Sequence, residues 1–500
     1  MTLPERPDVH HAGRYRPSPR RLSAACLALA LAACATPPAP LQSAGDLPSR
    51  WYAPVPVMDS EVQAHGGKEE GLGQWWAQFN DSALTQLIVT AQARNGSVLE
   101  AAARIAQARA ESVSAGASAQ PQLQGGVALQ RGRGSTGSLA STGSVSVDAS
   151  WELDLWGGLK AGRSAALAQL EASEASWHDA RVSVAAETAQ NYVRFRSCQR
   201  LADTLQDDAR SLATSAALTE RKVSAGLESP ANAALVRASA ASSAANLVAQ
   251  QAVCESLVKS LVALTGLTEP ELRVLLSQGV QEVPAPRNFE VEQVPARWLA
   301  QRPDLRSAER QAAAARQEID VAEANRWPQL SLLGSVGRTR ASGGNGSAMI
   351  FEGTSWSIGP SLSIPLLDGQ RRSAAADAAR GRYEEARSRY IQRVRDAVAE
   401  VENALTDLDA ASRRQSDAEK AVAGFDAFLN AQRRLTEAGA GSLLDLEDAR
   451  RTALSARSNL IDVQTDRVLA WIALYRAVGG GWSAESPPES TALSKAPPQD

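Results

Sequence analysis

Two stretches of the chain alternate strictly between apolar and polar side chains. In SVSVDASWELDLWG, residues 144–157, every second side chain is apolar and those between are mostly Ser, Asp or Glu. TSWSIGPSLSIPLLDG, residues 354–369, shows the same alternation and also ends in a Gly turn. A period of two is typical of a β-strand with one apolar face and one wet face. Each stretch is therefore predicted to be a strand, and the Ala-rich, charged segment after each one favours a long helix.

The two strands belong to a tandem repeat. The turn at Gly157 recurs at Gly369, and the turn at Gly226 recurs at Gly439 with nearly the same offset along the chain. A period of about 210 residues is too long for a solenoid and indicates a duplicated domain.

Each copy is predicted to contain a helix, a strand, a Gly/Ser loop, a second strand and two long helices. The first copy has helix 81–119, strands 122–130 and 144–157, and helices 158–225 and 228–265. The second copy has helix 295–326, strands 329–338 and 354–369, and helices 371–438 and 442–478. A helix of about 65 residues is about 100 Å long. Ala at many contact positions permits the close packing of a coiled coil.

The start of the chain is predicted to be a targeting segment. Arginines precede a short apolar run, residues 22–34, that is too short to span a bilayer. The run ends in Leu-Ala-Ala-Cys34, which resembles a bacterial lipobox, so Cys34 is expected to become the lipidated first residue; the alternative is an ordinary signal peptide with a chance Cys. The expected domains are a signal peptide (1–33), a lipidated Pro-rich tether (34–74), repeat 1 (75–270), a linker (271–294), repeat 2 (295–482) and a disordered C-terminal tail (483–500).

The predicted strands are long enough to cross a membrane at a tilt, which takes about 9–11 residues. Four strands cannot close a barrel, and open edges are not tolerated in lipid, so the chain is expected to share a barrel with further copies. Trp151, Trp156 and Trp356 are expected to form an aromatic girdle. The alternative is a soluble sheet packed on a helical bundle. The sequence contains no apolar run of about 18 residues that would indicate a transmembrane helix.

Composition excludes several other classes of protein. The net charge is −3 and charged residues make up 21% of the chain, so no general attraction to nucleic acid is expected. The four histidines have no metal-ligand spacing and no phosphate-binding loop opens a helix. The sequence therefore predicts no metal, no cofactor and no enzymatic activity.

Seven stretches, in order, resemble the TolC-like outer-membrane channel lipoproteins of tripartite efflux pumps. They are WWAQFNDSALTQLI, ARIAQARA, SWELDLWG, QRPDLRSAE, IPLLDGQRR, GSLLDLEDAR and YRAVGGGW, and they span residues 75–482. The resemblance implies a mainly α fold, a homotrimer with a shared 12-stranded transmembrane β-barrel, and a periplasmic α-helical tunnel. It also implies a lipid-anchored location in the outer membrane, a periplasmic adaptor, an inner-membrane pump of the resistance-nodulation-division type, and passive conduction of drugs or other small molecules.

The resemblance places the functional site at the helix-hairpin ends. Gly226 and Gly439 supply the positive φ of the turns, and the adaptor is expected to dock near them and near Gly441.

The return helix of the second hairpin carries the residues that match the family's periplasmic gate. They are Leu444, Asp445, Asp448 and Arg451. Three copies of two carboxylates would form a cation-binding constriction, and links between Asp448 and Arg451 would hold it shut. The alternative is that both Asp residues only complement the helix dipole. The first hairpin has Ser229, Pro230 and Asn232 at this place, so only the second is expected to gate.

Two cysteines are placed symmetrically about the first turn. Cys198 precedes Gly226 by as many positions as Cys254 follows it, so the two face each other in an antiparallel hairpin. In an oxidising periplasm they are expected to form a disulfide; the alternative is two buried free thiols.

Two other functions stay open. One is a type I secretion outlet for proteins, and the other is a structural periplasmic coiled-coil lipoprotein without a pore. The identity of the transported substrate is not encoded in a duct wall of this kind.

Overall fold

The computed structural model describes residues 52–53, 75–133, 139–286, 299, 301–344 and 350–480. All of them belong to one compact unit, residues 47–500. The expected signal peptide, Cys34, most of the tether and the C-terminal tail lie outside the described residues.

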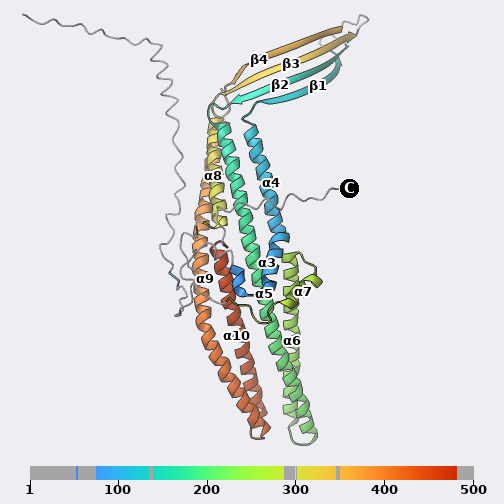
Figure 1. Cartoon of the computed structure of the whole chain (residues 1–500), viewed down its shortest axis with the longest axis vertical. Helices are drawn as coiled ribbons and strands as arrows, with labels where there is room; N and C mark the ends of the chain where they lie inside the picture. Colours follow the sequence, from blue (N-terminus) through green and yellow to red (C-terminus); the bar gives the residue numbers. More distant parts are fainter. Residues whose placement is uncertain are drawn as a thin grey trace, which may run out of the picture. The chain divides into compact units, whose positions relative to one another are not determined.

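The element order confirms the duplicated unit of helix, two strands and long helical hairpin (Figure 1). The 3-10 turn η1 (Trp75–Phe79) precedes α3 (Ser82–Arg94), α4 (Gly96–Ala117), β1 (Gln122–Arg133), β2 (Leu139–Leu153), α5 (Gly158–Ser224), α6 (Pro230–Thr265) and α7 (Glu269–Gln278). The second copy has α8 (Pro303–Ala324), β3 (Gln329–Gly344), β4 (Ile350–Ser363), α9 (Arg371–Glu437) and α10 (Leu443–Ala477). Helices α5 and α9 have 67 residues each, which corresponds to about 100 Å.

The four strands form one antiparallel sheet in the order β1-β2-β3-β4. The central pair, β2 and β3, joins the two copies, with Val147 opposite Val336. Strands β1 and β4 are the two edges, so one edge comes from each copy. All four strands extend beyond their predicted ends at the side away from the helices.

Each copy folds its long helices into an antiparallel hairpin, α5 with α6 and α9 with α10. The hairpins turn at Gly226 (φ +72°) and Gly439 (φ +73°), a backbone conformation that Gly adopts without the penalty of a Cβ. Ser229 and Ser442 then cap the return helices, and each hydroxyl accepts a backbone N–H at 3.2 Å. Within the described unit the sheet and the two turns lie at opposite ends of the long helices (Figure 1).

Two predicted elements differ in detail. The helix expected over residues 81–119 is split at Asn95, whose extended backbone ends α3 and whose side chain accepts the Ser97 N–H at 3.0 Å to begin α4. The expected linker, residues 271–294, begins inside α7.

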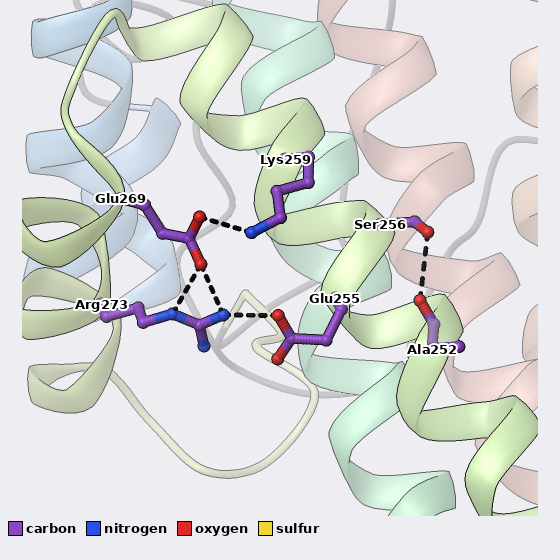
Figure 2. Close-up of polar contacts among 6 residues, drawn as sticks. All are labelled: Ala252, Glu255, Ser256, Lys259, Glu269 and Arg273. Carbon is purple, nitrogen blue, oxygen red and sulfur yellow. Dashed lines mark hydrogen bonds and ion pairs between the residues drawn. The ribbon is translucent and has the colours of Figure 1, made fainter.

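Helix α7 is fastened to α6 by a cluster of charged side chains (Figure 2). Arg273 bridges Glu269 of its own helix and Glu255 of α6, and Lys259 of α6 pairs with Glu269. The hydrogen bond from Lys259, and then those from Arg273, hold the pKa of the Glu269 carboxyl below its ordinary value. The cluster lies at the surface, where ion pairs add little to stability.

The main core lies where η1 and α3 pack against α5 and α10. Trp75 stacks on Trp471 with ring centroids 4.6 Å apart. The buried Tyr192 hydroxyl donates to Asp81 Oδ2 at 2.6 Å and accepts from Arg196 Nε at 3.1 Å. Asp81 also caps α3, so this one carboxylate ties the start of the first copy to α5.

Among the described helices, α6 alone is long and apolar enough to cross a membrane, with a mean hydropathy of 1.3 in its most apolar window. Its apolar character comes largely from Ala, Val and Leu, and it packs along α5 as the return arm of the first hairpin. We therefore interpret it as part of the helical wall.

Candidate gate at the hairpin ends

The two hairpin ends share a backbone but differ in side chains. Gly441 donates its N–H to the Leu435 carbonyl at 3.0 Å, and an added Cβ would lie 2.8 Å from Thr436 N. The corresponding position of the first hairpin is Glu228, whose carboxylate accepts hydrogen bonds from the Ser229 N–H and the Asn232 side chain. The second turn therefore needs Gly at 441 for space as well as at 439 for its φ.

The four predicted gate residues occupy the first turns of α10. Leu444 leaves 64% of its surface exposed. Asp445 lies three residues before Asp448, which forms an exposed ion pair with Arg451 one turn further on. The isolated chain therefore leaves all four available to groups outside it.

A second ion pair lies beside the first, and sequence reasoning missed it. Arg450 donates to Glu447 at 3.0 Å; the Arg450 side chain is buried and the Glu447 side chain is half-buried, with 9% and 12% exposed. The other Arg450 nitrogen approaches Ser215 Oγ on α5 at 3.5 Å. Burial raises the pKa of Glu447, with the nearby Asp208 carboxylate adding to the rise and Arg450 opposing it. The ion pair itself lies within α10, and the long hydrogen bond from Arg450 to Ser215 is its contact with the first hairpin.

A groove of about 700 Å³ separates α10 from the first hairpin at this end. All four predicted gate residues line its α10 side, and Leu212 of α5 and Leu235 of α6 line the opposite side. The structure therefore brings the four residues together on one groove wall.

The cysteines of the first hairpin lie opposite each other on α5 and α6. Cys198 and Cys254 form a disulfide with their Cα atoms 5.6 Å apart. The equivalent positions of the second hairpin, one repeat further along the chain, are Ala411 and Arg467. The cross-link therefore belongs to one hairpin of the two.

The sheet separates apolar from polar side chains between its faces. Register places Leu123, Val147, Val336 and Ile358 on one face, which is exposed in the isolated chain. The opposite face includes Ser335 and Ser357, whose hydroxyls are 2.8 Å apart, together with Asp148 and Glu152. A barrel built from this sheet has a wet lumen when the apolar face meets lipid.

The tryptophans do not form the single girdle that the sequence predicted. Trp151 lies two residues before the end of β2, and Trp156 stacks on Trp327 at 5.2 Å where the strands meet the helices. Trp356 is opposite Val336, seven residues before the end of β4, so it lies farther from the helix end of its strand than Trp151 does. Trp327, two residues before β3, is the partner of Trp156 that sequence reasoning missed.

Among the residues that the structure describes, no group of three or more His, Cys, Asp or Glu side chains is placed to hold a metal ion. His178 of α5 is partly buried against Trp177, with ring centroids 4.8 Å apart. Burial, and then the charge of Arg181, lower the pKa of His178 to about 4.

The sheet and the two long helical hairpins agree with comparisons of this chain with known proteins. The family model described as outer membrane efflux protein matches residues 87–267 and 294–480. The chain is 31% identical over 481 residues to the pyoverdine export outer membrane protein OpmQ of Pseudomonas putida, covering 94% of this chain and 99% of that protein. It is 26% identical to the cation efflux system protein CusC of Escherichia coli, covering 93% and 99%. The solved outer-membrane channel OprN superposes with a TM-score of 0.76 at 28% identity, covering 87% of this chain and 98% of that one.

Proposed function

The chain belongs to the outer membrane efflux protein family, and we propose that it forms the exit duct of a tripartite pump whose gate is built by Leu444, Asp445, Asp448 and Arg451. It is an outer membrane channel protein of the TolC-like class, in which copies combine to close the barrel. The family is one of transport proteins.

The observation that carries the duct is the sheet with two open edges and one apolar face. Strands β1 and β4 leave unpaired backbone groups that lipid does not tolerate. Pairing β4 of one chain with β1 of the next chain removes every open edge when three chains close the ring. The resulting 12-stranded barrel is continued by the helical hairpins as a tunnel across the periplasm.

The gate proposal is supported by the contrast between neighbouring ion pairs. Asp448 and Arg451 are exposed, so their pair is readily exchanged for contacts with another copy or a cation. Arg450 is buried and Glu447 is half-buried, so their pair within α10 is less open to exchange. Three copies of Asp445 and Asp448 around the tunnel mouth would concentrate negative charge and attract cations.

Removing the gate carboxylates tests this proposal. Asp445→Ala combined with Asp448→Ala is expected to raise single-channel conductance or open time in planar bilayers and to weaken block by divalent cations. The matched control, Glu220→Ala with Glu228→Ala, removes two carboxylates beside the first turn and is expected to conduct as the wild type does. If the two double variants behave alike, the gate lies elsewhere.

The partners follow from the position of the hairpins. We propose that a periplasmic adaptor docks near Gly226, Gly439 and Gly441. The adaptor would link the duct to an inner-membrane pump of the resistance-nodulation-division type. Lipidation at Cys34 would anchor each copy to the membrane.

The cargo is proposed to be a small molecule delivered by the pump. Relatives named for pyoverdine export and for cation efflux match 94% and 93% of this chain. Such different cargoes fit a wall that passes what it receives, and they favour small-molecule efflux over protein secretion. Accumulation of a fluorescent dye in cells with and without the chain, with adaptor and pump present, tests this proposal.

A further inference from the structure

Every basic side chain of the described strand residues lies on the apolar face of the sheet. Arg131 and Arg133 share the parity of Leu123 on β1, and Arg338 and Arg340 share the parity of Val336 on β3. Register confirms that both pairs share one face. Arg131 is opposite Ser141, Ser141 is opposite Ser342, and Ser342 lies two residues after Arg340, on the same face of β3. We call these four arginines the arginine collar.

The polar face carries the opposite charge. Its charged side chains within the described strands are Asp148 and Glu152. The collar therefore faces away from the duct, and cargo inside the duct cannot be what it binds.

The collar lies at one end of the apolar band. Leu330, beside the helices, is eight residues before Arg338 and ten before Arg340. At about 3.3 Å per residue and a tilt of about 40°, these positions lie roughly 20 and 25 Å across the membrane from Leu330. The apolar band of such a barrel is about 25 Å high. Arg340 therefore lies at the outer boundary of the hydrocarbon, with Arg338 just inside it and Arg131 beyond it.

One acid shares the face with the collar. Glu352 of β4 is directly opposite Arg340 and forms an ion pair with Arg338 at 2.8 Å. Four arginines against one carboxylate leave a charge of +3 on each copy at this level. Around a ring of three copies the excess is +9, in contact with the outer leaflet.

We propose that the arginine collar binds the phosphate groups of the glycolipid that forms the outer leaflet. This inference rests on the membrane-spanning barrel of the proposed function. Guanidinium groups bind phosphate oxygens in a bidentate fashion, and a position at the hydrocarbon boundary places them level with the phosphates rather than with acyl chains or bulk water. The collar would fix the depth of the barrel and surround it with a shell of bound lipid.

The test measures binding of phosphorylated lipid A to the purified trimer in phospholipid nanodiscs. The triple variant Arg131→Gln, Arg338→Gln, Arg340→Gln is expected to bind about a hundredfold more weakly, because each arginine near an anionic lipid surface contributes about fivefold in affinity. Lipid A stripped of its phosphates is expected to bind the wild type as weakly as the triple variant binds intact lipid A. Replacement of the same arginines by Lys keeps the charge but not the bidentate geometry, and is expected to leave an affinity between those of the wild type and the Gln variant.

A change of opposite sign keeps the test independent of folding defects. Glu352→Gln removes the acid that competes for Arg338 and is expected to strengthen binding about fivefold. The matched control, Asp148→Asn, removes a carboxylate from the polar face and should leave affinity unchanged.

Three results would overturn the collar: equal affinity of the triple variant and the wild type, equal binding of dephosphorylated lipid A, or displacement of lipid A by inorganic phosphate at equal phosphate concentration. Single-channel conductance of the wild type separates the two proposals. A trimer that conducts but ignores lipid A phosphates removes the collar alone, and a chain that forms no channel removes the duct.

Discussion

Two neighbouring ion pairs on α10 differ in how far their side chains are exposed to water, and we infer different roles for them. Asp448 and Arg451 are exposed, and such pairs contribute about 0–1 kcal/mol. Arg450 is buried and Glu447 is half-buried, so their pair is partly shielded from water. The first pair suits a contact that opens and closes, and the second suits a constant arrangement within α10.

The sequence indicated the exposed pair and not the buried one. Asp445, Asp448 and Arg451 could be identified because their spacing on one helix matches a family motif. The burial of Glu447 and Arg450 depends on α5, which lies far away in the sequence, and no local pattern encodes that contact.

His178 gives the chain a predictable sensitivity to acid. Its pKa is about 4 in the folded state and near its ordinary 6.5 in the unfolded state. Between these values the unfolded chain binds a proton that the folded chain does not, so folding stability falls as the pH drops from 6.5 towards 4.

His178→Gln is therefore expected to narrow the difference in thermal midpoint between pH 7 and pH 5 relative to the wild type. Thermal unfolding of the detergent-purified trimer at both pH values measures this. Curves for variant and wild type that run parallel over this range would contradict the assignment.

At the scale of elements, the long helices and the strands were predictable and the interruptions were not. Periods of two and the absence of proline over long stretches located β2, β4 and the four hairpin helices to within a few residues. The split at Asn95 was missed because capping by a single Asn side chain leaves the apolar periodicity of the flanking helices intact. The single girdle was a wrong prediction because Trp356 precedes its turn at Gly369 by 13 positions, whereas Trp151 precedes the turn at Gly157 by six.

The disulfide makes the two hairpins mechanically unequal. Cys198 and Cys254 close a segment of 56 residues, for which the chain-entropy estimate is about 4 kcal/mol at most. Replacing both cysteines with Ser is expected to lower the thermal midpoint and to speed hydrogen exchange in the adjoining turns of α5 and α6. Exchange in α9 and α10 serves as the internal control and should not change. Equal acceleration in all four helices would mean that the cross-link stabilises the whole trimer rather than its own hairpin.

At the scale of the whole molecule, the fold is incomplete as a single chain. Each of the two repeats within the chain supplies two strands, yet the sheet of the single chain still ends in open edges and exposes Leu123 and Val336. The need for further copies followed from the sequence, because the strand count is too low to close a barrel. The faces of the sheet followed as well, since alternation fixes them.

Neighbouring residues on opposite faces test that assignment. Val336→Arg places a charge near the middle of the lipid-facing band and is expected to cost about 2–4 kcal/mol per copy. Ser335→Arg places the same side chain in the wet lumen and should assemble normally. The yield of trimer in outer membranes is measured for both variants by gel electrophoresis of unheated samples. Equal yields of the two variants would contradict the assignment of the faces.

The cross-link between α5 and α6 ties the maturation of the channel to the redox state of its surroundings. A chain that crosses the inner membrane does so with Cys198 and Cys254 reduced, and only the oxidising periplasm joins them. Newly exported chains therefore lack the cross-link at first, and the hairpin of α5 and α6 gains it only in the periplasm. Cells deficient in thiol-oxidising enzymes would assemble channels without this disulfide, and their first hairpin would be more flexible. Protein recovered from a reducing cytoplasm would lack the disulfide for the same reason.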